Sequence, residues 1–357
     1  MRITFYQNSI SPHQLPLARE VAAAIGVDNV RYVYVAGVSE GRLKCGWTNV
    51  KESAGIRLIH IGADDSQDWI ECADVVYTGI RDLSLFTRRQ LKGLQTFYVS
   101  ERWFKPVPLG RFLLPGWFRI LSPFYIAMLV EFVRWQRSDS NARCFAIGPD
   151  ANKDFRHIGI PAYKIIPWGY YVDQDADIDV RHRSLEHKIE KRILWVGRMV
   201  TLKRVDTIIN ALRLLVEKKI QSTFSYTLTL VGDGPESNRL KKLSLGLPVR
   251  FLPFQPIEKV RDIMRKHDIF VFSSNGLEGW GAVVNEALAE GLVVLGSTAP
   301  GACRSLLPQN RLFKVGDARS LANLLAVEWM ANGLAAQWTP TGAARILLHI
   351  VTENNNE

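Results

Sequence analysis

The sequence predicts an α/β protein made of two Rossmann-like, doubly wound domains that face each other across a cleft. The chain has 357 residues, which is long for one core and suits two domains. In both halves, short apolar runs alternate with helical stretches. Strands that are apolar on both faces and alternate with helices are typical of parallel sheets with right-handed crossovers. Such sheets bind ligands at the carboxyl ends of their strands.

The C-terminal half shows this alternation most clearly. We expect strands at 192–197, 226–232, 249–254, 269–274 and 292–297. Helices are expected near 202–219, 235–245, 256–267, 282–290, 317–331 and 340–352.

The N-terminal half repeats the pattern less regularly. An amphipathic helix is expected from Leu15 to Ile25, and strands at 3–7, 30–37, 56–62, 74–79, 96–101 and 143–148. We therefore expect four parts: an N-terminal domain (1–165), a polar linker (166–190), a C-terminal domain (191–335) and a last helical segment (336–357) that can cross back to the N-terminal domain.

Composition restricts the class of protein. The four cysteines stand apart from one another, as expected for buried thiols in a reducing compartment rather than for disulfides or a zinc site. The N-terminus does not resemble a signal peptide, and no apolar run reaches the ~18–20 residues that span a bilayer, so a cytoplasmic protein is expected. The net charge is +10, and residues 81–143 hold eleven Lys or Arg against four Asp or Glu. This excess suits an anionic partner, although a basic surface without a partner is an alternative.

The segment 109–137 departs from the alternation. It is dense in Phe, Leu, Ile and Trp, and prolines limit it to one full helix. One interpretation is an interfacial element that contacts anionic lipid peripherally, at the inner face of the cell membrane; the other is a core helix. Its basic residues are Arg111, Arg119, Arg134 and Arg137.

Two cations follow the strand that ends at Gly197. Arg198 and Lys203 lie around the start of the next helix, where unpaired N–H groups favour anions. A forked guanidinium and a compact ammonium together can hold a diphosphate. The "VGDGPE" stretch (231–236) supplies a tight turn through Gly232. We take Gly197 and Gly232 as further positions near the diphosphate; a plain strand-to-helix turn is the alternative for Gly232.

The stretch "NGLEGWGAVVNEALAEG" (275–291) has two acids, Glu278 and Glu286, with seven residues between them. A helix that starts near Gly281 directs its first amide groups into the cleft. Glu286, one turn into that helix, can accept hydrogen bonds from a ribose diol. Glu278 lies on the loop, near the group that is attached to the diphosphate. The backbone positions concerned are Trp280, Gly281, Ala282 and Val283.

The stretches "GRMVTLKRVD", "VGDGPE" and "EGWGAVVNEALAEG" together resemble retaining glycosyltransferases of family 4, which have the GT-B fold. The motifs fall in the family's order over about 190–330, with Trp280 where Phe is usual. The resemblance implies that Arg198 and Lys203 bind the donor diphosphate and that Glu286 binds the ribose. It also implies that Glu278 holds the donor sugar.

The N-terminal half resembles the family more faintly. Serines and a proline replace the glycines that usually follow the first strand, and His13 can reach the sugar or acceptor, or else cap the helix. Where relatives carry a histidine, this chain reads "SERWF", and Glu101 is our candidate to face the cleft. At 168–173, "WGYYVD" keeps Gly169 of the family's interdomain turn but departs from it at Trp168 and Tyr170.

We therefore expect a retaining hexosyltransferase that uses a UDP-, GDP- or other nucleotide-diphosphate sugar and requires no metal. The acidic "DQDADID" (173–179) lacks the glycine and final glutamate of a calcium loop. The expected acceptor is a carbohydrate or lipid-linked glycan of bacterial surface polysaccharide, lipopolysaccharide or glycolipid synthesis. Alternatives are an epimerase or phosphorylase of the same fold, or a basic binding protein; no nucleic-acid module is recognised.

Overall fold

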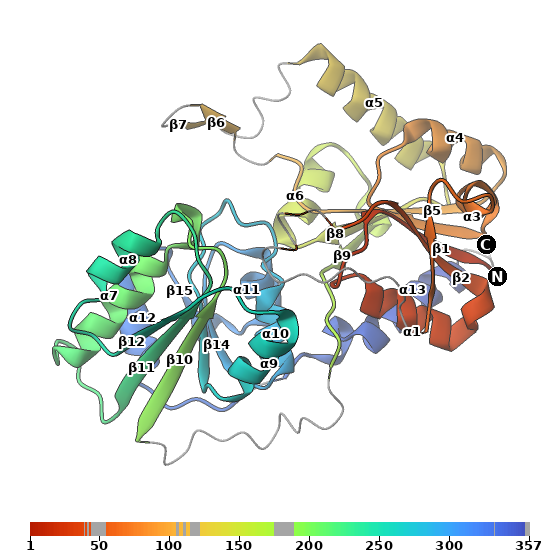
Figure 1. Cartoon of the computed structure of the whole chain (residues 1–357). Coiled ribbons are helices and arrows are strands. Elements are labelled where there is room, and N and C mark those ends of the chain that lie inside the picture. Colours follow the sequence, from red (N-terminus) through yellow and green to blue (C-terminus); the bar gives the residue numbers. More distant parts are fainter. Residues whose placement is uncertain are drawn as a thin grey trace. The chain divides into compact units, whose positions relative to one another are not determined.

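The computed structural model describes residues 1–38, 40, 43, 55–104, 107–109, 112–114, 122–174, 189–331 and 333–353. The chain divides into two compact units, which Figure 1 shows coloured along the sequence. Unit 1 consists of Met1–Val38, Asn49–Tyr171 and Ala336–Glu357, and unit 2 of Ser39–Thr48 and Val172–Ala335. Each unit has its own parallel sheet, so the predicted fold class of two Rossmann-like α/β domains is confirmed.

The sheet of unit 1 has the order β3-β2-β1-β4-β5-β8-β9, and all its strand pairs are parallel. Its strands are β1 (Ile3–Ser9), β2 (Val30–Ala36), β3 (Arg57–His60), β4 (Val75–Thr78), β5 (Gln95–Ser100), β8 (Arg143–Ile147) and β9 (Ile165–Trp168). A separate antiparallel hairpin pairs β6 (Val107–Leu109) with β7 (Phe112–Leu114). Because β9 takes 165–168, the expected linker begins later than residue 166.

Helices cover both faces of this sheet. The helices are α1 (Leu15–Ile25), α3 (Ser66–Cys72), α4 (Leu83–Leu91), α5 (Pro123–Ser138), α6 (Pro149–His157) and α13 (Pro340–Glu353). Figure 1 shows α1 and α13 on one face and α3 and α4 on the other. The last helix belongs to unit 1 because it packs on α1, where Thr341 Oγ1 donates to the Glu20 carboxylate at 2.7 Å.

The sheet of unit 2 has the order β12-β11-β10-β13-β14-β15 and is also parallel. Its strands are β10 (Glu190–Val196), β11 (Ser225–Val231), β12 (Val249–Leu252), β13 (Ile269–Phe272), β14 (Val293–Ser297) and β15 (Leu312–Phe313). Its helices are α7 (Val205–Val216), α8 (Ser237–Leu243), α9 (Ile257–Arg265), α10 (Val283–Ala289), α11 (Gly301–Leu306) and α12 (Ala318–Leu325). A short 3-10 turn, Thr201–Lys203, precedes α7.

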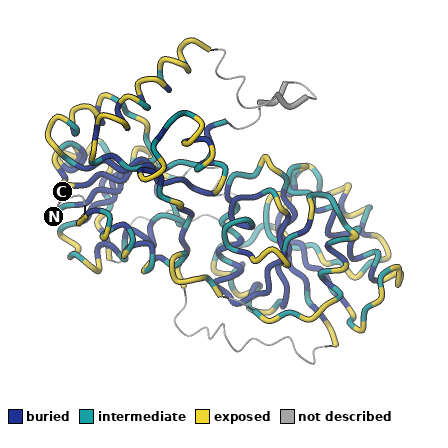
Figure 2. Tube along the Cα trace, turned by 180° about the vertical axis from the view of Figure 1, so that it is seen from behind, coloured by how far each residue is buried: buried dark blue, intermediate teal, exposed yellow. Residues whose placement is uncertain are grey.

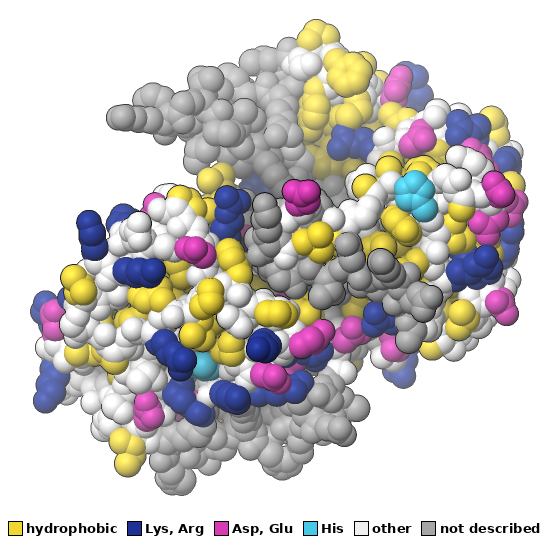
Figure 3. All heavy atoms as spheres, viewed as in Figure 1, with side chains coloured by type: hydrophobic (Ala, Val, Ile, Leu, Met, Phe, Trp, Pro, Cys, Tyr) yellow, Lys and Arg dark blue, Asp and Glu magenta, His cyan; other side chains and the backbone are white. Residues whose placement is uncertain are grey.

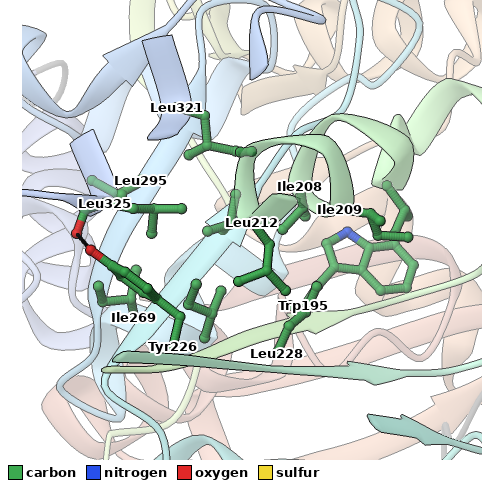
Figure 4. Packing of buried hydrophobic residues seen from close by; sticks show 14 of the residues in the cluster. Trp195, Ile208, Ile209, Leu212, Tyr226, Leu228, Ile269, Leu295, Leu321 and Leu325 are labelled. Carbon is green, nitrogen blue, oxygen red and sulfur yellow. Dashed lines mark hydrogen bonds between the residues drawn. The ribbon is translucent and has the colours of Figure 1, made fainter. Parts of the chain in front are cut away.

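The core of unit 2 explains why these segments fold as they do. Central strands are apolar on both faces because helices cover both, and α7 and α12 pack their apolar sides on β10 and β11. In Figure 4, Trp195 and Leu228 of the sheet lie against Ile208 and Leu212 of α7. The hydroxyl of Tyr226 donates to the Leu325 carbonyl at 3.2 Å, which ties the strand to the end of α12. Figure 2 shows both sheets as the buried centres of their units.

Candidate functional site

The strand order of unit 2 reverses between β10 and β13, because β10 leads outward to β11 and β12 while β13 leads to β14 and β15. Loops that leave the carboxyl ends of the strands at such a point diverge and leave room for a ligand. The loops after β10, β11 and β13 carry the unit 2 residues selected from the sequence, and α10 carries Val283 and Glu286.

The glycines of the first two loops let backbone approach backbone. Gly232 has φ +131°, and a Cβ there would lie 1.9 Å from the Gly197 carbonyl oxygen. Gly234 has φ +155°, and its Cβ would lie 2.4 Å from the Met199 oxygen. The Met199 amide in turn donates to the Asp233 carbonyl at 2.8 Å. Packing between the loops after β10 and β11 is therefore sufficient to explain the "GDG" sequence, and Gly232 itself is buried.

A carboxylate lies between these glycines. Asp233 accepts hydrogen bonds from the Ser237 hydroxyl and from the Gly234 amide, and these bonds hold the pKa of its carboxyl below the usual value. The turn after β11 therefore carries a fixed negative charge, which disfavours a phosphate there. The cations of the neighbouring loop are the better phosphate ligands.

Lys203 is held by the loop after β13. The Ser273 hydroxyl donates to its carbonyl oxygen at 2.7 Å, and the Asn275 amide donates to the Leu202 carbonyl at 2.8 Å. Its ammonium Nζ lies 2.5 Å from Glu278 Oε2. The structure thus brings together two residues that the sequence analysis assigned to different groups of the donor. Ser273 was not selected there, although small polar residues at the end of the buried "IFVFSS" strand were visible.

Arg198 lies in the same loop as Lys203, directly after Gly197. Its side chain is exposed, whereas that of Lys203 is half-buried. This loop therefore supplies one exposed guanidinium and one partly buried ammonium that is paired with Glu278. The two cations suit a diphosphate with two separated anionic groups.

Trp280 lies inside unit 2 rather than on its surface. It is 1% exposed, and its indole Nε1 donates to the Asn285 side chain at 2.8 Å. The next residue, Gly281, has φ +96°, and a Cβ there would lie 2.6 Å from the Phe272 ring. The indole thus packs inside unit 2, and the expectation that the backbone of Trp280 lies near the donor stays a prediction. The indole anchors the loop to α10, and Gly281 lets the chain pass over Phe272.

Helix α10 begins at Val283, two residues later than expected, with Ala282 as its N-cap. In its first turn, the Val284 amide donates to the Gly281 carbonyl at 3.0 Å and the Glu286 amide donates to the Ala282 carbonyl at 3.2 Å. Glu286 lies in this turn and is partly exposed, on the same helix that Trp280 anchors. Glu278, on the loop, and Glu286, on the helix, are thus separated by a buried tryptophan and a glycine bend.

The two candidates of unit 1 meet through a third residue. The Tyr170 hydroxyl donates to Glu101 Oε1 at 3.1 Å, and the Tyr170 ring lies 5.9 Å from the ring of His13, centre to centre. The three residues follow β9, β5 and β1, whose carboxyl ends lie at one edge of the sheet. Tyr170 was noted in the sequence only as a departure from a family pattern, and nothing local linked it to residues 69 or more positions away.

The loop that carries His13 is fixed without glycines. The buried Tyr32 hydroxyl donates to the Ser9 carbonyl at 3.0 Å and accepts from the Ser11 amide at 3.4 Å. Burial raises the pKa of Tyr32 well above its usual value, so the hydroxyl stays protonated and keeps donating. The Tyr171 amide donates to the His13 carbonyl at 3.0 Å, which joins this loop to the segment of Tyr170.

The described part of the 109–137 segment consists of hairpin residues of β6 and β7 and of helix α5. The helix begins at Pro123, as expected for a proline at the first helical position. Its inner face, with Phe132 and Trp135, packs in the aromatic core of unit 1, as the core-helix interpretation expected. Its outer face leaves Phe124 82% exposed, together with Ile126 and Val130. Figure 3 shows hydrophobic side chains over this helix. Arg111 and Arg119 lie outside the described residues.

Neither a metal-binding cluster nor a membrane-crossing helix occurs among the described residues. Within the described part of the chain, no three His, Cys, Asp or Glu side chains form a group that could hold a metal ion. Of "DQDADID", residues 175–179 lie outside the described residues. None of the helices in the described ranges has the length and apolar character needed to cross a bilayer.

Part of the chain matches a known protein family. Residues 190–333 match the family described as "Glycosyl transferases group 1". Sulfoquinovosyl transferase SQD2 of Arabidopsis thaliana is 27% identical over 157 residues, which span 42% of this chain but only 29% of that protein.

Solved structures match the whole chain. The structure of HepE from Anabaena in complex with UDP is 16% identical, with a TM-score of 0.57, and covers 100% of this chain and 98% of that one. The lipopolysaccharide outer core galactosyltransferase WaaB is 14% identical, with a TM-score of 0.60 and the same coverage. The chain therefore has the fold of GT-B proteins, and its unit 2 is similar to the group 1 glycosyltransferases.

Proposed function

We propose that this chain is a glycosyltransferase that moves a sugar from a nucleotide-diphosphate donor to an acceptor hydroxyl and retains the anomeric configuration. The observation that carries the proposal is the placement of Lys203 and Glu278 in contact at the reversal point of the unit 2 sheet. One is a phosphate ligand and the other a hydroxyl ligand, and a nucleotide sugar offers both groups next to each other. The match of residues 190–333 to the group 1 glycosyltransferases supports it.

The proposed chemistry depends on the leaving diphosphate. Negative charge grows on this group as the glycosidic bond breaks, so cations already held in place lower the barrier. Lys203, fixed by two loops, supplies a constrained charge, and Arg198 can fold over the phosphates with its fork of donors. With these charges present, we propose that the reaction requires no metal ion. The bond from the anomeric carbon to the diphosphate breaks, and the acceptor oxygen forms its bond to that carbon on the same face while its proton passes to the departing phosphate. Attack on the face of the leaving group accounts for retention.

The two acids have different proposed partners. Glu286, in the first turn of α10, accepts hydrogen bonds from the ribose hydroxyls. Glu278 accepts them from the hydroxyls of the donor sugar, and the amides of Gly281, Ala282 and Val283 lie between them in sequence, near the phosphates. This division differs from that of glycoside hydrolases, where one carboxyl group must protonate the leaving oxygen.

The acceptor is proposed to bind at the edge of unit 1 where His13, Tyr170 and Glu101 meet. A carboxylate and an imidazole held by a tyrosine suit the hydroxyls of a carbohydrate or a lipid-linked glycan. We propose a role in bacterial surface polysaccharide, lipopolysaccharide or glycolipid synthesis. The lipopolysaccharide galactosyltransferase WaaB, which shares the fold, supports this class of acceptor.

The outer face of α5 supports peripheral contact with an anionic membrane. Phe124, Ile126 and Val130 are exposed apolar side chains at one end of the helix, and Arg134 and Arg137 follow them toward the other end. Apolar side chains enter the headgroup region, while arginines pair with lipid phosphates. The protein would then bind a lipid-linked acceptor at the membrane surface.

Donor binding tests the proposal. A thermal-shift panel of UDP, GDP and their sugars is expected to identify one nucleotide that raises the melting temperature. Glu286→Ala should remove most of that shift and the sugar transfer, whereas Glu217→Ala, the same charge change at the exposed end of α7, should change neither. If Glu286→Ala binds and transfers like the unchanged protein, the proposal is wrong.

Acceptor dependence separates transfer from other reactions of the same fold. Release of the nucleoside diphosphate should rise when glycan acceptor is added and should persist in EDTA. An epimerase would release none, and a phosphorylase would respond to inorganic phosphate instead.

Membrane contact is tested separately. Co-sedimentation with phosphatidylglycerol vesicles should be lost on changing Arg134 and Arg137 to Glu or Phe124 to Ser. Leu245→Ser, at an exposed apolar residue of unit 2, is the control.

A further inference from the structure

Glu278 and Lys203 are paired with each other in this structure. Lys203 Nζ and Glu278 Oε2 are 2.5 Å apart, and both side chains are 18% exposed, so water screens the pair only in part. The ammonium also lies 5.2 Å from the centre of the Phe272 ring. A partly buried, hydrogen-bonded ion pair of this kind is a defined arrangement of the resting site rather than a loose surface contact.

The backbone on both sides of the pair is held as well. On the lysine side, the Lys203 carbonyl accepts from Ser273 and the Leu202 carbonyl accepts from Asn275. On the acid side, the Glu278 amide donates to the Asn275 carbonyl at 3.1 Å. The backbone of Asn275 therefore joins the loop of Lys203 to the loop of Glu278.

This arrangement matters because a diphosphate must approach the same ammonium. It can replace the Glu278 carboxylate, or it can share Lys203 with it, since an ammonium has three donors. Replacement leaves a partly buried carboxylate without its cation, and sharing brings two anions close together. Both are unfavourable. A donor that also carries a sugar gives the carboxylate new hydroxyl donors, whereas the nucleoside diphosphate gives it none.

We propose that Glu278, through its bond to Lys203, is a specificity-determining residue that makes the site prefer the intact nucleotide sugar over the nucleoside diphosphate product. This inference rests on the proposed function, because it takes Lys203 as a phosphate ligand. The carboxylate pairs with the Lys203 ammonium when the sugar is absent. When the sugar is present, the carboxylate accepts hydrogen bonds from the sugar hydroxyls instead. After transfer, the carboxylate returns to Lys203 and the product is released more readily.

The test measures affinity by calorimetry for a nucleoside diphosphate and its glucose conjugate, as UDP with UDP-glucose and GDP with GDP-glucose. Glu278→Gln should tighten binding of the diphosphate by about fivefold, the value of one partly exposed ion pair. The same change should weaken binding of the glucose conjugate, so that the preference between the two collapses. Glu217→Gln, an exposed carboxylate outside the site, should leave both affinities unchanged.

A second pair of variants separates the ion pair from plain repulsion by Glu278. In a Lys203→Met background, Glu278→Gln should change diphosphate affinity by less than about twofold, because no ammonium remains to be released. If the gain is as large in that background, the carboxylate acts on the phosphates directly and the inference is overturned. A Glu278→Gln variant that binds the diphosphate no more tightly overturns it too. Lys203→Gln replaces Lys203→Met if the latter does not melt cooperatively.

The proposed function fails in a different way. If no nucleoside diphosphate and no glucose conjugate binds the unchanged protein, the site is not a donor site, and both proposals are wrong. If they bind and Glu286→Ala abolishes binding while Glu278→Gln leaves the preference intact, only the inference about Glu278 is wrong.

Discussion

Gly232 is the position where one methyl group should have the largest effect on unit 2. An alanine Cβ would lie 1.9 Å from the Gly197 carbonyl oxygen and 3.0 Å from its carbonyl carbon. Carbon and oxygen atoms normally stay about 3.3 Å apart, so one backbone must move by more than 1 Å. Neither side is the end of a flexible side chain, and the loops after β10 and β11 are joined by the hydrogen bond from Met199 to Asp233.

The expected loss has two parts. Holding alanine at φ +131° costs about 1–3 kcal/mol. Overpacking against a rigid neighbour costs about 1–3 kcal/mol more. Together they predict that Gly232→Ala lowers the free energy of unfolding of unit 2 by roughly 2–6 kcal/mol, or its melting temperature by roughly 10 °C. Because Gly197 precedes Arg198, displacement of its carbonyl should also weaken donor binding.

Gly246→Ala is the matched control. Gly246 also has positive φ, +77°, but no atom lies within 4 Å of its added Cβ. It should cost about 1 kcal/mol, from backbone conformation alone. Urea unfolding followed by hydrogen–deuterium exchange of peptides from residues 190–232 reports on unit 2 directly. If both variants unfold at the same urea concentration, the clash with Gly197 is relieved at no cost, and the reasoning from backbone approach is refuted.

Three further predictions follow from single side chains. Burial lowers the pKa of Lys191 to about 8; the unfolded chain, with its higher lysine pKa, therefore binds more protons, and stability should rise by about 1.5 kcal/mol from pH 7.5 to 9.5. Lys191→Met should lose this rise in urea midpoints, and an unchanged pH profile would contradict the assignment. Trp280→Phe should destabilise unit 2 by about 1–2 kcal/mol, through loss of the bond to Asn285, yet leave calorimetric donor affinity unchanged; a large loss of affinity would place the indole at the ligand. Tyr170→Phe keeps the ring beside His13 but loses the bond to Glu101, so KM for a glycan acceptor should rise about fivefold while donor affinity stays constant; an equal loss of both would refute a role toward the acceptor.

The fold could be predicted from the sequence because buried parallel strands leave a strong local signal. Runs such as 226–232 and 269–274 are mostly apolar, and the strands Ser225–Val231 and Ile269–Phe272 were found there. Short polar helices left no such signal. Helices α3 and α6 have seven and nine residues, and each buries only three of them. Helices of this length are stable only when packed on a sheet, so their own sequence carries little information.

Prediction of the candidate site followed the same division. The positions of Arg198, Lys203, Glu278 and Glu286 at strand ends could be inferred from motif order. The buried position of the Trp280 indole could not be inferred. Its partner, Asn285, comes within reach only when the loop folds back on α10.

By itself, the sequence determined the two α/β units and the kinds of side chain that end their central strands. Only the tertiary structure decided which of those side chains meet. Lys203 and Glu278 are 75 positions apart, and Tyr170 is 69 positions from Glu101 and farther still from His13. A parallel sheet gathers the ends of strands that crossover helices separate along the chain. Hydrophobic patterns specify each strand, but the contacts across the sheet edge depend on strand order and loop path, which no local pattern contains.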